Sequence, residues 1–263
     1  MRFRKMNPND IPQLKALWKE GFGDSEEEIN AFFEKVWPNA GGFCAEENDR
    51  IVSMVFALPV TLSLAGETKK AVYLYAVTTQ EKFRRQGICK KLLAFAEKEL
   101  KKKYVSCMLL VPEDDHLAAY YEGLGFSQTP SVQLLDLQEQ KQAGEAAEIS
   151  AQAYAGLRET ILFDVPHVQY DKMLLSYEAA HYKFYQLQIA NSFGCAAVCA
   201  KEGGCVVDEL LPDAAFLPAL ATVIPADRWY VKCPGQTHVF SMMKWLEEED
   251  PVYASAYLAF SFD

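Results

Sequence analysis

A cluster of basic residues around one glycine carries the clearest chemistry in this sequence. Arg84, Arg85 and Lys90 flank Gly87, and apolar residues recur at helical spacing from Ile88 onward. The first backbone N–H groups of a helix have no partner within the helix and carry the positive end of its dipole. Because glycine lets a ligand approach the backbone closely, this stretch predicts a turn whose amides bind a pyrophosphate.

The spacing of this turn excludes two common nucleotide-binding motifs. The Walker A pattern GxxxxGK[ST] is missing, and so is the GxGxxG fingerprint of dinucleotide-binding folds. A basic turn that only caps an amphipathic helix is the structural alternative. The hexapeptide at residues 84–89 does not by itself separate the two interpretations.

The first half of the chain reads as an ordered series of helices and strands that would position this turn. Periodicity and turn residues predict helices near 11–18 and 25–36, strands at 42–46, 51–64 and 70–78, a helix after Gly87, a strand at 105–111, a helix at 114–124 and closing strands at 126–137. The basic turn therefore lies between the end of a strand and the start of a helix.

The second half repeats this broad order. The sequence predicts helices at 145–162, 168–181 and 213–224 and strands at 183–190, 194–200, 205–211 and 229–233. No strong residue-level repeat accompanies this order. We predict two domains, at residues 1–137 and 148–263, joined by a polar linker at 138–147.

Two motifs in the first half resemble those of a known family. Residues 84–89 (RRQGIC) resemble the R/QxxGxG/A acyl-CoA-binding signature of the GCN5-related N-acetyltransferases (GNATs), with Cys89 in the second small-residue position. Residues 114–126 (DDHLAAYYEGLGF) resemble the family's NxxAxxxYExxGF element, with Asp114 replacing Asn and Leu117 replacing Ala. Both motifs in this order predict an α+β GNAT fold, a mixed and largely antiparallel sheet flanked by helices, followed by a second GNAT-like domain.

The resemblance implies an enzyme that moves an acetyl group from acetyl-CoA, used as a co-substrate, to a primary amine by direct attack. Tyr121 would protonate the departing thiolate, and the N–H of Val77 would stabilise the oxyanion. The residues expected to bind the cofactor are Val77, Thr79, Arg84, Arg85, Gln86, Gly87, Ile88, Cys89 and Lys90. The general base stays open between Glu81, a tyrosine of the 70–78 strand, and a chain of water molecules.

The second half lacks equivalents of both motifs. Residues 209–215 (ELLPDAA) stand where the phosphate turn would fall, and they are acidic and interrupted by proline. The arrangement is similar to tandem GNATs with one degenerate copy, and to the first two domains of enhanced-intracellular-survival-type acetyltransferases. A non-catalytic acyl-CoA sensor or scaffold is the alternative function.

Composition limits the partners. With 26 Lys and Arg against 36 Asp and Glu, the net charge of −10 makes nucleic acid a poor partner, since phosphate neutralisation dominates that affinity. No apolar run approaches the roughly 18 residues of a membrane span. Seven cysteines without a CxxC pair and only four histidines predict reduced thiols and no metal site. We expect a cytoplasmic protein with a small-molecule amine acceptor; oligomers are compatible with the sequence.

Overall fold

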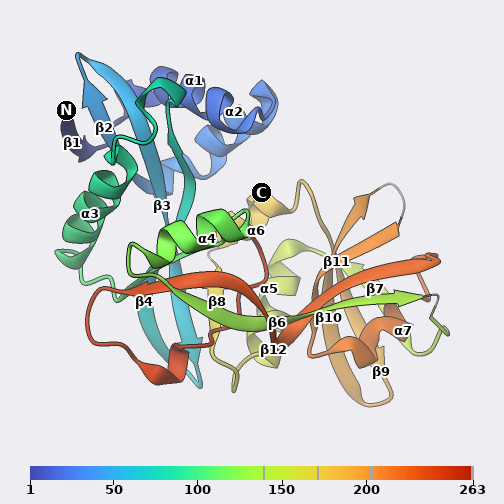
Figure 1. Cartoon of the computed structure of the whole chain (residues 1–263). Helices are drawn as coiled ribbons and strands as arrows, with labels where there is room; N and C mark the ends of the chain where they lie inside the picture. Colours follow the sequence, from blue (N-terminus) through green and yellow to red (C-terminus); the bar gives the residue numbers. More distant parts are fainter. Residues whose placement is uncertain (139, 171, 202–203, 262–263) are drawn as a thin grey trace.

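The computed structural model describes residues 1–261 apart from 139, 171 and 202–203, and its strands form one continuous twelve-stranded sheet (Figure 1). The strands are β1 (Arg2–Lys5), β2 (Gly41–Glu47), β3 (Arg50–Leu64), β4 (Glu67–Thr79), β5 (Cys107–Leu110), β6 (Ser127–Gln138), β7 (Glu145–Ile149), β8 (His167–Tyr170), β9 (Lys183–Ile189), β10 (Ser192–Lys201), β11 (Gly204–Leu211) and β12 (Arg228–Trp245). Their order across the sheet is β1-β2-β3-β4-β5-β12-β11-β10-β9-β7, with β6 paired to β12 and β8 to β3.

Helices cover the sheet on both faces. They are α1 (Ile11–Phe22), α2 (Glu26–Lys35), α3 (Ile88–Lys101), α4 (Asp115–Glu122), α5 (Ala151–Ile161), α6 (Lys172–Glu178) and α7 (Leu217–Leu220). Ser25 and Glu28 form a capping box at the start of α2, which confirms the helix start expected there. The mixed, largely antiparallel sheet with flanking helices confirms the predicted α+β fold class.

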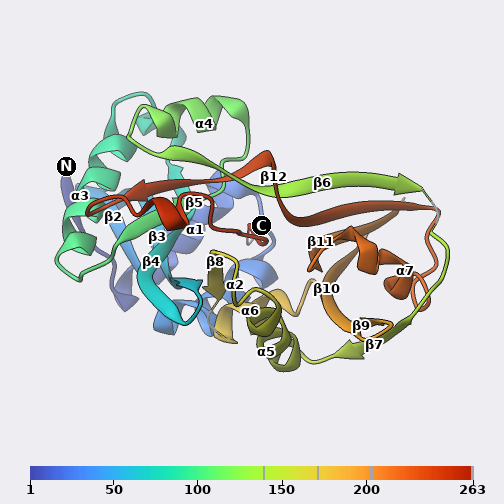
Figure 2. The same ribbon diagram turned by 90° about the horizontal axis from the view of Figure 1, so that it is seen from below.

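The alternation of side chains along β3 and β4 separates two cores in the first half. Phe56 of β3 packs with α1 and α2, whereas Val55 packs with α3 and α4 on the opposite face. Helices α5 and α6 join the first of these cores, and Tyr177 of α6 lies 6.2 Å from Phe32 of α2 between ring centroids. The second half therefore packs on the α1–α2 side of the N-terminal sheet, as Figure 2 shows from below.

Two long strands run through both halves (Figure 2). β12 begins beside β11, with Cys205 opposite Trp229, and ends beside β5, with Met242 opposite Leu110. β6 follows β12 along nearly its whole length. The N-terminal sheet is therefore completed by the last four residues of a strand that begins in the second half.

Three elements of the second half differ from the sequence-based prediction. Residues 145–149 form β7 rather than the start of a helix, because they pair with β9 and Ser150 caps the helix that follows. Residues 167–170 form β8 rather than helix, since they extend the edge of β3. The helix expected at 213–224 is reduced to a 3-10 turn and α7.

The strand predicted at 229–233 is also too short. β12 continues to Trp245, although Pro234 and Gly235 are turn residues, because irregular pairing between Pro234 and Ser241 absorbs them opposite β6. The other helices and strands expected in the first half are confirmed, and so are β9, β10 and β11.

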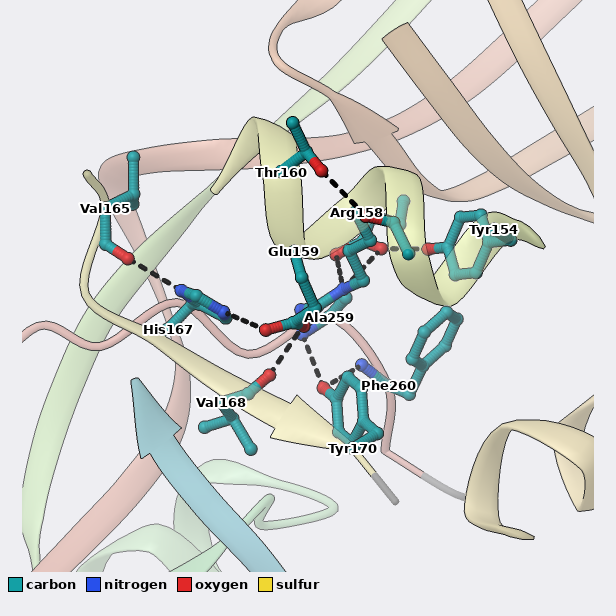
Figure 3. A network of polar contacts seen from close by, with 12 residues as sticks. Tyr154, Arg158, Glu159, Thr160, Val165, His167, Val168, Tyr170, Ala259 and Phe260 are labelled. Carbon is teal, nitrogen blue, oxygen red and sulfur yellow. Dashed lines mark hydrogen bonds and ion pairs between the residues drawn. The ribbon is translucent and has the colours of Figure 1, made fainter. Parts of the chain in front are cut away.

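A buried polar network links α5 with strands β8 and β11 (Figure 3). The Nε of Arg158 donates to Glu209 on β11 at 2.9 and 3.1 Å, and both side chains are fully buried. The Nη1 of Arg158 donates to the carbonyl of Val168 at 3.0 Å, and the guanidinium stacks on the Tyr170 ring. Tyr154 donates to Glu209, so helix α5, strand β8 and strand β11 are fixed to one another.

The same region fixes the C-terminal segment. The hydroxyl of Tyr170 accepts from the amides of Ala259 and Phe260 at 3.0 and 3.1 Å. Lys232 donates to the carbonyl of Ala259 at 2.7 Å, and Tyr73 of β4 donates to the carbonyl of Ser261 at 2.7 Å. This segment therefore ties β12 to the N-terminal sheet.

No helix in the described part of the chain is long and apolar enough to cross a membrane.

Candidate active site

The strand that leads to the basic turn contains a β-bulge at the predicted oxyanion residue. Met54 pairs with Thr78 and Phe56 with Tyr75, so Ala76 and Val77 together face the single residue Val55. Ala76 has a positive φ of 47°, which redirects the backbone at this point. A bulge of this kind turns backbone groups of Val77 away from the regular ladder.

The bulge lies beyond the point where β4 and β5 separate. The parallel pairing of these strands runs from Ala71 and Cys107 to Tyr73 and Leu109, and no further pair forms between them among the described residues. The two strands therefore part before β4 reaches Val77. Beyond Leu109 the backbone of β5 makes no ladder pair with β4 in the described part of the chain.

The basic turn is held by its own side chains. The Nε of Arg84 donates to the carbonyl of Thr79 at 2.9 Å, and the side-chain Nε2 of Gln86 donates to the carbonyl of Lys82 at 3.0 Å. Arg84, Arg85 and Lys90 remain exposed. The side chains of Arg84 and Gln86, two of the predicted cofactor-binding residues, thus stabilise the turn. The cationic side chains of the turn are accessible to solvent.

Two residues of the turn adopt the left-handed backbone conformation. Arg85 has φ 60° and Gly87 has φ 72°, with one residue between them. Gly87 is the N-cap of α3 and provides no side-chain cap. In the described structure, the backbone N–H groups of residues 85–90 donate to no protein acceptor. They are available donors at a helix N-terminus, a position that favours anion binding.

Helix α1 supports this turn from the other side, a contact that the sequence did not reveal. The carboxylate of Glu20 accepts from the amide of Glu81 at 3.0 Å and from the side chain of Gln80 at 3.2 Å. The hydrogen bond from Glu81 lowers the pKa of Glu20. A Cβ on Gly21 would lie 2.5 Å from the hydroxyl of Thr78, so α1 packs closely against the end of β4.

The second motif meets the first in space. Val77, Cys89 and Tyr121 pack in the same core cluster, and the Tyr120 ring packs edge-to-face on Tyr121 with centroids 5.5 Å apart. Burial raises the pKa of Tyr121, and neighbouring Cys89 and Tyr120 raise it further. The Tyr121 hydroxyl therefore keeps its proton at neutral pH.

Helix α4 positions Tyr121 by its ends and by ring packing. Asp114 caps the helix by accepting from the amide of Leu117 at 2.7 Å, so the residue that replaces the family's asparagine has a local role. The ring of Tyr121 packs edge-to-face on Phe126 with centroids 5.6 Å apart. Gly125 follows the helix with φ 86°, a conformation that favours glycine.

The candidate general bases are not brought together with these groups. Tyr73 is buried and hydrogen-bonded to Ser261, and Tyr75 packs on Trp18 in the opposite core cluster. Glu81 is exposed at the turn. Among the residues described, no cluster of three or more His, Cys, Asp or Glu side chains could hold a metal ion.

Comparisons with known proteins agree with this geometry. Residues 2–129 match the family model of the acetyltransferase (GNAT) domain. The N-terminal half of the chain is therefore a GNAT domain. A search among curated proteins finds no match.

Solved structures extend the likeness to both halves. A conserved protein of Enterococcus faecalis V583, described as a probable N-acyltransferase, is 14% identical with a TM-score of 0.78, covering 94% of this chain and 72% of its own. Eis1 from Mycobacterium abscessus is 10% identical with a TM-score of 0.68, covering 94% and 74%. A tandem GNAT protein of the clavulanic acid pathway is 12% identical with a TM-score of 0.54, covering 95% and 99%. The chain thus has the fold of a tandem GNAT protein similar to the Eis type.

Proposed function

We propose that this protein is an N-acetyltransferase that uses acetyl-CoA and acetylates a primary amine. The observation that carries the proposal is the set of unpartnered amides at residues 85–90, close in the fold to Tyr121. These amides would bind the pyrophosphate of coenzyme A, with Arg85 and Lys90 adding positive potential. The separation of β4 and β5 would receive the pantetheine arm.

The proposed reaction is direct attack. The neutral amine attacks the thioester carbonyl, and the N–H of Val77 in the bulge donates to the developing oxyanion, a contribution of about 3 kcal/mol in comparable sites. The C–S bond then breaks, and Tyr121 gives its proton to the thiolate. The attacking nitrogen releases a proton to a base among solvent-exposed groups or water. The products are the acetylated amine and free coenzyme A.

We propose that the two domains are residues 1–137 and 148–263, with 138–147 as a linker, and that the second copy binds no cofactor. Glu209, at the position of the missing phosphate turn, is buried in an ion pair with Arg158, and Asp213 caps the turn that follows. The strand β12 ends in the N-terminal sheet, so the second domain also supports the first.

Release of free thiol from acetyl-CoA tests the proposed activity. The full chain is incubated with a panel of primary amines, including polyamines, amino acids and aminoglycosides, and thiol is measured. We expect amine-dependent release for at least one class. Binding of coenzyme A without turnover on any amine would instead support the alternative function, an acyl-CoA sensor or scaffold.

A matched pair of glycine variants tests the turn. Gly87 and Gly66 both have positive φ, 72° and 85°, and open space around the position of a Cβ. Gly87→Ala and Gly66→Ala should each lose about 1–2 kcal/mol of unfolding free energy. Only Gly87→Ala should weaken binding of coenzyme A, by about tenfold. Alanine disfavours the positive φ at position 87, so part of the binding free energy would be used to return the turn to the conformation that binds the pyrophosphate. Calorimetry and urea unfolding measure both quantities; equal affinities for the two variants would contradict the proposed site.

A further inference from the structure

A cavity of about 1100 Å³ lies at the end of β4 opposite the candidate active site. It is lined by residues 70–72 of β4, whereas the candidate site begins at Val77 and continues to Lys90. Along the edge of β3, pairing with β2 ends at Ala57 and pairing with β8 begins at Val60. The cavity opens at this break in the sheet edge and extends beneath the C-terminal end of α3.

The charged lining of this cavity is basic. Lys5, Lys70, Lys103 and Lys172 line it, and none of the described lining residues is acidic. Lys5 pairs with Glu99 at 3.0 Å. The other three lysines form no ion pair with the described part of the chain. In a protein of net charge −10, this local excess of cations favours an anion at the cavity mouth.

The rest of the lining is largely apolar. Phe43, Val72, Leu100 and Val105 come from the core beneath α3, and Trp37 adds an aromatic surface. Side chains of this kind bury the body of a ligand, while a few polar groups fix its orientation. The volume is slightly above the range for small-molecule sites, about 300–1,000 Å³.

We propose that this cavity is a second ligand site that binds a small organic anion with an apolar body, of the class of a medium-chain carboxylate. The apolar tail lies among the residues under α3, and the carboxylate lies among Lys70, Lys103 and Lys172. The site is independent of the acyl-transfer chemistry, because it uses the other end of β4. A neutral apolar ligand would make the same apolar contacts but would form no ion pairs with the lysines.

Calorimetric titration of the full chain tests this assignment, with decanoate below its micelle concentration as the probe and decanol as the neutral comparison. We expect one decanoate to bind about tenfold more tightly than decanol. Saturating coenzyme A should leave the decanoate affinity unchanged. Absence of decanoate binding, equal affinity for decanol, or competition with coenzyme A would each overturn the proposal.

Paired charge reversals locate the site. Lys70→Glu with Lys103→Glu should weaken decanoate binding at least tenfold. Lys98→Glu with Lys141→Glu changes the net charge by the same amount at exposed positions outside the cavity, and should change the affinity less than twofold. All four side chains are exposed, so both variants should keep the far-UV circular dichroism of the wild type. Equal losses in the two variants would show a general charge effect and overturn the site.

Discussion

Tyr121→Phe should lower kcat for acetyl transfer about 100-fold and leave the KM for acetyl-CoA within about twofold. The substitution removes only the hydroxyl, so the edge-to-face packing on Phe126 is kept. The hydroxyl is proposed to protonate the thiolate, a group that exists only after bond breaking begins. Its loss should therefore act on the chemical step and not on binding of the diphosphate.

Tyr120→Phe is the matched control for this prediction. Tyr120 precedes Tyr121 in the sequence and packs on its ring, and this substitution also removes one hydroxyl, from a side chain that is more exposed than Tyr121. We expect its kcat to stay within about threefold of the wild type. Steady-state thiol release measures both variants. A large loss of kcat in Tyr120→Phe with near-normal kcat in Tyr121→Phe would contradict the proposal, because it would identify Tyr120 as the proton donor.

The second large effect is expected on stability. Arg158→Met should lower the free energy of unfolding by about 3–5 kcal/mol, because it leaves the carboxylate of Glu209 buried without its counter-charge. The carbonyl of Val168 would also lose its donor. Urea unfolding followed by circular dichroism measures the loss.

Two further variants distinguish the effect of leaving a buried charge unpaired from the effect of losing an ion pair in general. Arg228→Met breaks the pair with Asp136, in which both side chains are about half exposed, and should cost less than about 1 kcal/mol. Arg158→Met combined with Glu209→Leu should recover part of the loss, since an apolar pair replaces a buried ionic one. Equal costs for Arg158→Met and Arg228→Met would contradict the role assigned to the buried network.

Local signals in the first half were enough to predict most of its fold. Gly87, the apolar stripe of α3 and helix α4 depend on signals within a few residues, and each lies where the sequence indicated. The two motifs also meet in space, since Val77, Cys89 and Tyr121 share one core cluster. What these residues bind and do stays a prediction.

Long-range pairing explains what the sequence could not reveal. β7 and β8 are short strands whose form depends on partners far along the chain, so their own residues did not distinguish them from helix. β12 passes through Pro234 and Gly235 because β6 runs alongside it. The support of the turn by Glu20 depends on a contact between α1 and residues about sixty positions away.

The same limit applies to the buried pair in the second half. The residues next to Glu209 in the sequence predict an acidic, degenerate phosphate turn. In the fold its carboxylate faces Arg158 and Tyr154 from α5. A charged residue at the end of a strand can be buried in an ion pair between two elements or exposed to solvent. The sequence around it does not distinguish these two environments.

The central claim is that the backbone amides of residues 85–90 bind the diphosphate of coenzyme A. The most direct measurement is a titration of isotope-labelled full chain with coenzyme A, followed by amide nitrogen–proton NMR spectra. The account predicts that the largest shifts fall on the amides of residues 85–90, with smaller shifts at Val77. Saturable binding that leaves these amides unmoved, or no binding at all, would contradict it.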